Sequence, residues 1–290
     1  MRQAVLGGRR GAGVMAAAVA GALLLAACSS GEADEGSVAA ADVVHVHGLG
    51  VSQEGVYVAT HHGLYEVVGD SVRAASDAGH DLMGFTVAGP GDLLASGHPD
   101  LSVEELQVED KPPLLGLVHS TDGHTWESLS LLGEADFHSL EAAHGRVYGF
   151  DGTTGRFMVS DDRRTWVTRA EQLSIVDFAV SPVDADLVVA TVEGGIGRSR
   201  DGGRSWEQAS SEQLVFVDWG SRGVYGITAD GQLTVSEDDG NTWDALGTVS
   251  GQPEALLAAD DAIYAAVAGK GIVRSTDGGQ TFEMVVDTGA

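Results

Sequence analysis

Cysteine and basic residues are both scarce in this chain of 290 residues. Cys28 is the single cysteine, so the chain can form neither an intrachain disulfide nor a cysteine-based metal cluster. Only 16 Lys and Arg residues accompany 43 Asp and Glu, which gives a formal net charge of −27. Because nucleic-acid binding requires cations that neutralise phosphates, this balance argues against nucleic acid as a partner.

Aromatic residues are also few, at 6% of the chain, whereas glycine is abundant, with 41 residues. Hydrophobic residues make up 43% and charged residues 20%, which excludes a disordered or collagen-like chain. A globular protein rich in turns fits this composition better than one built from long helices.

The first 27 residues have the composition of an export signal. Arg2, Arg9 and Arg10 precede an uncharged apolar run that ends in Leu-Ala-Ala-Cys28. This ending resembles the lipobox of bacterial lipoproteins, and the resemblance implies cleavage before Cys28 and a lipid on its thiol. We therefore expect a signal peptide over 1–27 and a lipid anchor on the extracytoplasmic face of the cell membrane. An uncleaved signal anchor is the alternative.

Two further regions follow the signal peptide. Residues 28–42 contain the cysteine and then a small-residue, acidic stretch, which is typical of a flexible tether. Residues 43–290 hold the regular hydrophobic patterning and are expected to form the folded domain.

Five segments of the domain match one another at a near-constant spacing. Their closing aromatics are 40, 40, 37 and 39 residues apart. Asp and Ser side chains can bond to the backbone of their own turn, and the aromatic can fold back into an apolar layer. The pattern predicts five β-hairpin turns, each with one acid and one aromatic: Asp122 and Trp126, Asp162 and Trp166, Asp201 and Trp206, Asp239 and Trp243, Asp277 and Phe282. The alternative, a structural Ca²⁺ site, needs more oxygen ligands than one Asp per turn.

Short apolar runs ahead of each turn complete a repeating unit. The first unit fits the same plan without an intact turn segment. Six units are expected, near 43–76, 82–130, 136–170, 175–209, 214–248 and 253–288. Four strands in each unit predict an all-β fold, a six-bladed β-propeller. Residues 99–113 are extra in the second unit and are expected to form a long loop.

The five segments resemble the Asp-box, or bacterial neuraminidase repeat. The chain as a whole resembles sialidase-like bacterial lipoproteins of the glycosyl hydrolase type, through the following stretches: His45–Leu49, Ala59–Leu64, Met83–Thr86, Gly97–Asp100 and Gly133–His138. The resemblance implies that each box joins the third and fourth strands of a blade, with any site on the opposite face. Asp-box propellers include both glycosidases and non-enzymatic proteins, and the resemblance supplies no catalytic residues.

The residues that a sialidase needs are not apparent. That mechanism requires three arginines converging on the substrate carboxylate, and our register places no arginine in the loops of the expected site face. We therefore expect no ordinary sialidase activity.

Histidines are absent from the second half of the chain, since all ten lie between residues 45 and 144. Aligning the first strand of each unit predicts a ring around the channel mouth: His47, Met83, His138, Asp177, Asp218 and Glu254. The loops between second and third strands add His61, His62 and His98. Five other residues lie just outside the ring: His45, His80, Asp81, Glu134 and Asp136.

Two functional classes fit this arrangement. The first is a binding module for a metal ion or for a polar or glycan ligand, with a glycan or an envelope protein as further candidate partners. Imidazole suits zinc and copper, and a thioether favours copper. The candidate ligands are His45, His47, His61, His62, Met83, His98 and His138. The acids that could ligate or orient them are Glu134, Asp136, Asp177, Asp218 and Glu254.

The second class is a glycoside hydrolase that uses two of the channel acids, at separations of ~5–5.5 or ~6.5–9.5 Å. A water-filled channel whose histidines make only hydrogen bonds is the remaining alternative.

Overall fold

The computed structural model describes residues 43–76 and 78–289. The predicted signal peptide, Cys28 and the tether lie outside these residues. The described chain forms 24 short strands and one 3-10 helix, η2 (Glu104–Leu106). No helix in the described ranges is long and apolar enough to cross a membrane.

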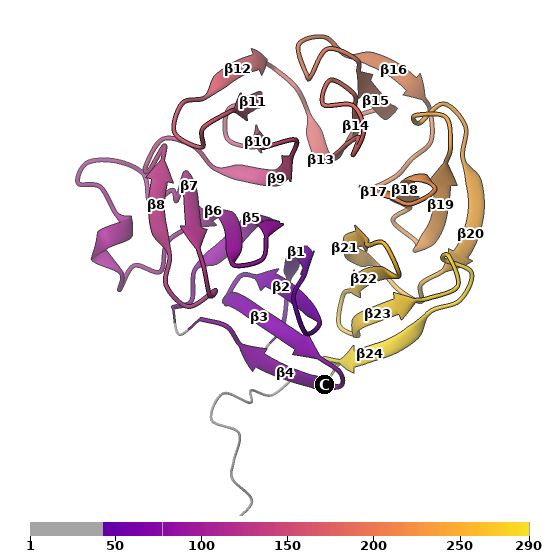
Figure 1. The fold of residues 1–290 in the computed structure, drawn as a ribbon, viewed down its shortest axis with the longest axis horizontal. Coiled ribbons are helices and arrows are strands. Elements are labelled where there is room, and N and C mark those ends of the chain that lie inside the picture. The colour runs from indigo at the N-terminus through magenta and orange to yellow at the C-terminus, as the bar shows by residue number, and fades with distance from the viewer. Residues whose placement is uncertain (1–42, 77, 290) are drawn as a thin grey trace, which may run out of the picture. The chain divides into compact units, whose positions relative to one another are not determined.

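The strands form six antiparallel sheets of four, which we number as blades one to six in chain order. The blades surround a central channel (Figure 1). Blade one contains β1 (Val46–Val51), β2 (Val56–Thr60), β3 (Gly63–Val68) and β4 (Ser71–Ala74). Blade two contains β5 (Asp81–Gly89), β6 (Asp92–His98), β7 (Leu117–Ser120) and β8 (Glu127–Ser130). Blade three contains β9 (Phe137–Ala143), β10 (Arg146–Asp151), β11 (Arg156–Ser160) and β12 (Val167–Ala170).

The second half of the chain repeats this plan. Blade four contains β13 (Ile175–Val180), β14 (Val188–Val192), β15 (Gly195–Ser199) and β16 (Glu207–Ser210). Blade five contains β17 (Phe216–Gly220), β18 (Gly223–Ile227), β19 (Gln232–Ser236) and β20 (Asp244–Thr248). Blade six contains β21 (Pro253–Ala258), β22 (Ile263–Val267), β23 (Gly271–Ser275) and β24 (Glu283–Asp287). The predicted six-bladed β-propeller is confirmed.

The hydrophobic core is divided among the interfaces between blades. Six clusters of buried residues are present, and each combines side chains from two neighbouring blades. The cluster between blades one and six includes Val46 and Ala255. Because every sheet contains only consecutive strands, the ring closes by this packing and not by a shared strand.

Side chains fix the turns between the third and fourth strands, as the repeat predicts. In blade two, Asp122 Oδ1 accepts hydrogen bonds from the backbone N–H groups of His124 (2.8 Å) and Thr125 (3.1 Å). Ser120 Oγ accepts from the N–H of Gly123 (2.8 Å), whose φ of +81° suits glycine. Asp162, Asp201 and Asp277 accept from their own turns in the same way.

The turn acid of blade five is Asp238, so the assignment to Asp239 is wrong. Asp238 accepts hydrogen bonds from the backbone N–H (2.8 Å) and the hydroxyl (2.7 Å) of Thr242. Asp239 instead adopts a φ of +60° and pairs with Arg200 at 3.2 Å. In all five turns the acid follows a serine by two residues, a spacing that identifies Asp238 from the sequence.

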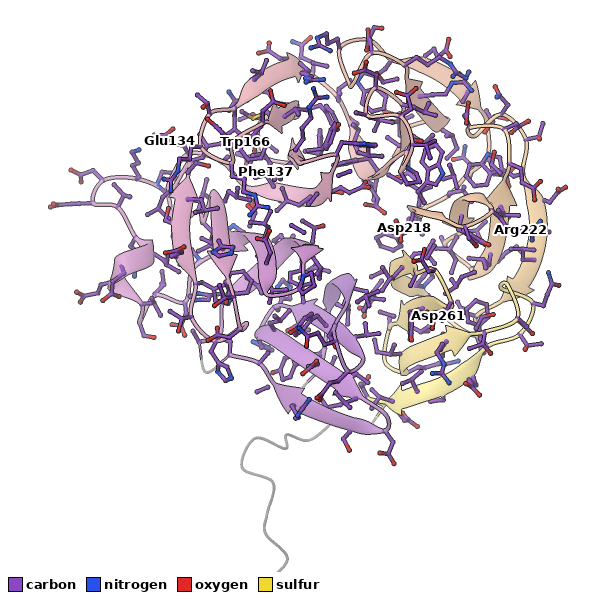
Figure 2. The ribbon with its side chains drawn as sticks, viewed as in Figure 1. Glu134, Phe137, Trp166, Asp218, Arg222 and Asp261 are labelled. Atoms are coloured by element: carbon purple, nitrogen blue, oxygen red, sulfur yellow. The ribbon has the colours of Figure 1, made fainter. Side chains whose placement is uncertain are left out.

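The closing aromatic of each turn packs against the preceding blade. Trp126 is 7% exposed and lies in the cluster between blades one and two. Trp166 is half-buried: it stacks on Phe137 of its own blade, with ring centroids 4.6 Å apart (Figure 2), and its Nε1 donates a hydrogen bond to Ser130 Oγ of blade two at 2.9 Å. Trp206, Trp243 and Phe282 are half-buried at the later interfaces. The repeat therefore contributes to contacts between blades as well as to its own hairpin.

Candidate metal-binding site

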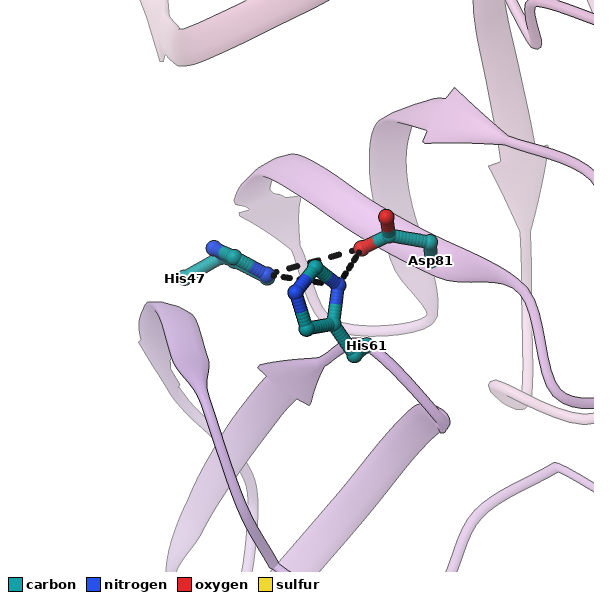
Figure 3. A group of neighbouring side chains, drawn as sticks. All are labelled: His47, His61 and Asp81. Atoms are coloured by element: carbon teal, nitrogen blue, oxygen red, sulfur yellow. Dashed lines mark hydrogen bonds and ion pairs between the residues drawn. The ribbon is translucent and has the colours of Figure 1, made fainter. Parts of the chain in front are cut away.

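Three potential ligands meet where blades one and two approach the channel. His47 lies in β1, His61 lies in the turn between β2 and β3, and Asp81 begins β5. His61 Nδ1 is 2.6 Å from Asp81 Oδ1, and His47 Nε2 is 3.2 Å from His61 Nδ1 and 3.4 Å from Asp81 Oδ1 (Figure 3). These ligand atoms all lie within 4.8 Å of one another. We call His47, His61 and Asp81 the primary triad.

Local backbone irregularity places His47 in this group. The β1–β2 pairing shifts register between Val46 and Gly48, which leaves His47 as the extra residue of a β-bulge. A bulge re-aims the side chain of its extra residue. The same irregularity occurs at Met83 in β5 and at His138 in β9. All three bulge residues line the channel.

A second group of histidines and carboxylates lies next to the primary triad, between blades two and three. His98 Nδ1 is 3.4 Å from Asp81 Oδ2, and His98 Nε2 is 3.7 Å from Asp136 Oδ2. The same Asp136 oxygen is 2.9 Å from His138 Nε2. Asp136 is only 4% exposed, and its other oxygen is buried with no hydrogen-bond partner among the described residues. We call His98, Asp136 and His138 the secondary triad.

On the other side of the primary triad, the series of histidine and carboxylate contacts ends at blade six. His45 is 3.9 Å from Glu254 through Nδ1 and Oε1, and its ring centroid lies 5.3 Å from that of His61. Five of the seven predicted metal ligands therefore lie in one continuous chain of imidazoles and carboxylates: His45, His47, His61, His98 and His138. Among the described residues, no hydrogen bond or ion pair joins Met83 or His62 to this chain.

The environment of the histidines affects their protonation. Burial lowers the pKa of His47 to about 4, against an opposing effect of Asp81. His47 is therefore neutral at neutral pH, which is the form that binds metals. The hydrogen bond to Asp136 instead raises the pKa of His138.

The predicted acids Glu134 and Glu254 have their main contacts outside the two triads. Glu134 pairs with Lys111 at 2.6 Å and lies away from the channel (Figure 2). Glu254 accepts the backbone N–H of Val46 at 3.3 Å and so joins blade six to blade one. Of the predicted acids, only Asp136 contacts two histidines, whereas Asp81, a member of the primary triad, was not among the predicted ligands.

Asp177 and Asp218 lie deeper in the channel than the alignment of first strands predicted. The bulge in β13 falls between Ile175 and Asp177, so Val176 takes the position of His47 in blade four. In blade five, Asp218 pairs with Tyr225 and is level with Glu141, which pairs with Tyr148 in blade three. The sequence alignment therefore places Asp177 and Asp218 too near the mouth. The first strands of blades four and five have no histidine at the bulge position to fix the alignment.

The deep channel acids connect neighbouring blades. Glu141 accepts the backbone N–H of Val180 (2.6 Å), and Asp177 that of Val217 (3.1 Å). Asp218 accepts the N–H of Ala258 (2.6 Å) and lies at the inner edge of the ring (Figure 2).

The burial of these acids favours their neutral forms. Burial raises the pKa of Asp177 to about 7 and that of Asp218 to about 6. Burial also raises the pKa of Glu141 well above its ordinary value, with a further effect of Asp218. The innermost strands enclose a cavity of about 360 Å³ that these acids line.

One arginine lies directly beside a loop of the site face. Arg156 begins β11, directly after the turn between β10 and β11, and pairs with buried Asp151 at 3.3 Å. The loop itself, residues 152–155, contains no arginine, as the register predicts. The charge of Arg156 is matched by Asp151, an acid at the end of the preceding strand.

The fold places the chain in the class of six-bladed β-propellers. No protein-family model matches the sequence, and no curated protein matches it. Solved structures do match, at identities that show the fold alone. One is PorZ, a surface component of the type-IX secretion system of Porphyromonas gingivalis, with TM-score 0.56, 14% identity and 88% of this chain covered. This chain spans only 34% of the PorZ chain.

Two other structures cover most of both chains. YCF48 bound to a D1 peptide matches with TM-score 0.51 and 16% identity, over 83% of this chain and 82% of that one. A chain of a nidogen–laminin complex matches with TM-score 0.63 and 9% identity, over 80% and 92%.

Proposed function

We propose that this propeller is a binding module for a transition-metal ion, held at the channel mouth by the primary triad. The observation that carries the proposal is the convergence of His47 Nε2, His61 Nδ1 and one Asp81 oxygen within 4.8 Å. Two imidazoles and a carboxylate form a ligand set that suits Zn²⁺ or Cu²⁺.

The distances within the triad support a metal as the ligand. Donor atoms bound at ~2.0–2.1 Å to a tetrahedral ion are about 3.3 Å apart. The separations from His47 Nε2, 3.2 and 3.4 Å, are close to this value. The shorter contact between His61 and Asp81, 2.6 Å, is a hydrogen bond that metal binding would open by about 0.7 Å.

Glycoside hydrolysis has less support from the geometry. Such enzymes need one carboxyl group as acid and a second as base or nucleophile. Asp177 and Asp218 each accept a backbone N–H from the next blade. An acid that holds two blades together is poorly suited to move during a reaction.

The test is calorimetric titration of the full-length chain with Zn²⁺ and Cu²⁺, after purification in detergent without a histidine tag. The double variant His47→Ala/His61→Ala should lose at least ~100-fold in affinity, because two of three ligands are gone. His124→Ala is the matched control, since His124 lies exposed in a turn outside the cluster. Binding weaker than micromolar in the wild type, or equal binding in the double variant, would contradict the assignment.

We also propose that the chain is exported and anchored to the cell membrane through a lipid on Cys28. The support is the charged, apolar and small-residue order of residues 1–28. Cys28→Ala should move the protein from the membrane fraction to the soluble fraction, with Cys28→Ser as a second variant. An unchanged membrane fraction in both variants would argue for an uncleaved signal anchor.

A further inference from the structure

The primary triad provides only three donors to a metal ion. His47 Nε2, His61 Nδ1 and one Asp81 oxygen lie within 4.8 Å of one another, and no fourth imidazole, thiolate or carboxylate among the described residues joins them. Structural zinc sites have four protein donors, whereas sites with three keep the fourth position for a water molecule or a ligand. An ion at this triad therefore keeps one position that the protein does not fill.

The triad is accessible to a small molecule. The side chains of His47 and Asp81 are 20% and 23% exposed, and that of His61 is 42% exposed. His47 also lines the channel cavity of about 360 Å³. Pockets for small ligands have volumes of ~300–1,000 Å³. A ligand that enters at the mouth can thus reach the ion and place its other atoms in the cavity.

The charge of the cavity selects among metal-binding groups. Glu141, Asp177 and Asp218 line it together with apolar side chains, and none of the described residues around it is Lys or Arg. The whole chain has a formal net charge of −27. These charges repel anions, and Asp81 cancels part of the charge of the ion that would attract them. A neutral nitrogen donor meets no such repulsion, and imidazole is a favourable ligand of zinc and copper.

We infer that the metal ion at the channel mouth binds a second ligand, which offers an imidazole to the open position. The imidazole belongs to a small molecule or to a histidine side chain of a peptide. This second ligand rests on the proposed function, because the ion at the primary triad is part of its site. The three protein donors hold the ion, and the ion in turn recognises the ligand.

Cobalt provides a direct measurement of the fourth position. Co²⁺ binds the same nitrogen and oxygen donors as Zn²⁺, and its visible absorption depends on the number and type of those donors. The spectrum of full-length wild-type chain loaded with Co²⁺ should change on addition of imidazole and reach saturation. A capped tripeptide with a central histidine distinguishes the two sources of the ligand. It should bind as tightly as imidazole if the mouth accepts peptides, and at least ~10-fold more weakly if only small molecules fit.

A comparison with azide tests the role of the cavity charge. At pH 8, above the pKa of about 7 for Asp177 and of about 6 for Asp218, both carboxylates are ionised. Imidazole should then bind at least ~10-fold more tightly than azide, an anion of similar size. Asp177→Asn/Asp218→Asn keeps oxygen acceptors for the backbone but removes two charges, so it should retain the ion and reduce this preference by at least ~3-fold.

Controls separate coordination from non-specific binding and from extraction of the metal. His124→Ala should match the wild type, since His124 lies exposed in a turn outside the triad. His47→Ala/His61→Ala should show neither the cobalt spectrum nor a response to imidazole. Gel filtration in the presence of imidazole should leave Co²⁺ on the wild-type chain, as a ternary complex requires.

The outcomes distinguish the second ligand from the proposed function. A spectrum unchanged by imidazole, in protein that retains Co²⁺, would overturn the second ligand and leave the metal site. Removal of Co²⁺ by imidazole would do the same, because the ligand would then compete with the triad. Tighter binding of azide than of imidazole would overturn the assigned ligand class. A wild-type chain that binds neither Co²⁺ nor Zn²⁺ would overturn both proposals.

Discussion

The mouth of the channel and its interior both contain carboxylates, but they interact with different partners. At the mouth, Asp81 and Asp136 contact imidazoles, and these histidines lie in a turn, in bulges or at the end of a strand. In the interior, Asp177 and Asp218 accept backbone N–H groups from the next blade. The same residue type thus provides donor atoms for a ligand at one level of the ring and connects the blades at another.

The neighbouring residues explain this difference. Beside the histidines, backbones of adjacent blades approach closely at glycine. A Cβ on Gly84 would lie 2.4 Å from the carbonyl oxygen of Phe137, so no side chain fits there. In blade four the corresponding residue is Asp177, whose carboxylate spans the gap to Val217. Blades joined at glycine leave the nearby side chains free to face the mouth.

The largest effect that separates the two regions should be stabilisation by metal. Zn²⁺ at 100 times its dissociation constant should raise the free energy of unfolding by about 2.7 kcal/mol, because it binds the folded state alone. Asp218→Asn should retain this gain, and His47→Ala/His61→Ala should abolish it. Thermal unfolding with and without Zn²⁺ measures both. An equal loss in Asp218→Asn would mean that the mouth and the interior act as one site.

A substitution in the interior should reduce stability more than one at the mouth. Asp177→Ala leaves the N–H of Val217 without its acceptor and should cost ~1–3 kcal/mol in metal-free protein. His62→Ala should change the free energy of unfolding by less than ~0.5 kcal/mol, since its side chain is exposed and only its backbone N–H is hydrogen-bonded among the described residues. Denaturant unfolding of the two variants checks this order, and the reverse order would contradict the division of roles.

The sequence predicts the fold much better than it predicts the contacts of the channel histidines and acids. Turn serines, acids and aromatics recur at a near-constant spacing in five units, and the short apolar runs identify a sixth unit without the turn, which together give six blades of four strands. The same periodicity correctly brings His47 and His138 to the channel. It cannot show a bulge, which shifts the register by one residue, and therefore Asp177 was misplaced and Glu141 was missed.

The direction of a side chain at the end of a strand is also invisible to periodicity. Asp81 and Glu134 are both acids near the expected ring, yet one contacts histidines and the other contacts Lys111. The difference depends on the path of the loop after β6, where Lys111 lies. No local sequence signal reports that path.

The pH dependence of stability offers a smaller test of the interior. Asp177 has a pKa of about 7 in the fold against 3.8 unfolded, and Asp218 has a pKa of about 6. The folded state therefore binds the protons of these two acids more tightly than the unfolded state does. The resulting contribution to the free energy of unfolding is complete below about pH 4 and is lost as the pH rises through 6–7. His47 has the opposite effect: because burial lowers its pKa to about 4, its contribution reduces the free energy of unfolding as the pH falls below 6.5.

Comparison with an amide variant isolates the contribution of the acids. We expect the melting temperature of metal-free wild type to fall by a few degrees between pH 6 and pH 8. Asp177→Asn keeps an oxygen acceptor for Val217 but cannot ionise, so its melting temperature should fall less over the same range. Parallel pH profiles for the two proteins would show that Asp177 is not titrating there.

The smallest expected effect lies within the mouth itself, at the adjacent residues His61 and His62. His61 Nδ1 contacts both His47 and Asp81, whereas His62 is exposed and hydrogen-bonds to Thr60 only through its backbone N–H. His62→Ala should therefore change Zn²⁺ affinity by less than twofold, while His61→Ala should reduce it by at least ~10-fold because a direct ligand is lost. Calorimetric titration of the two single variants makes the comparison under identical conditions. Equal losses would mean that the turn between β2 and β3 rearranges to offer both imidazoles to the ion, and the primary triad would then need His62 as a fourth ligand.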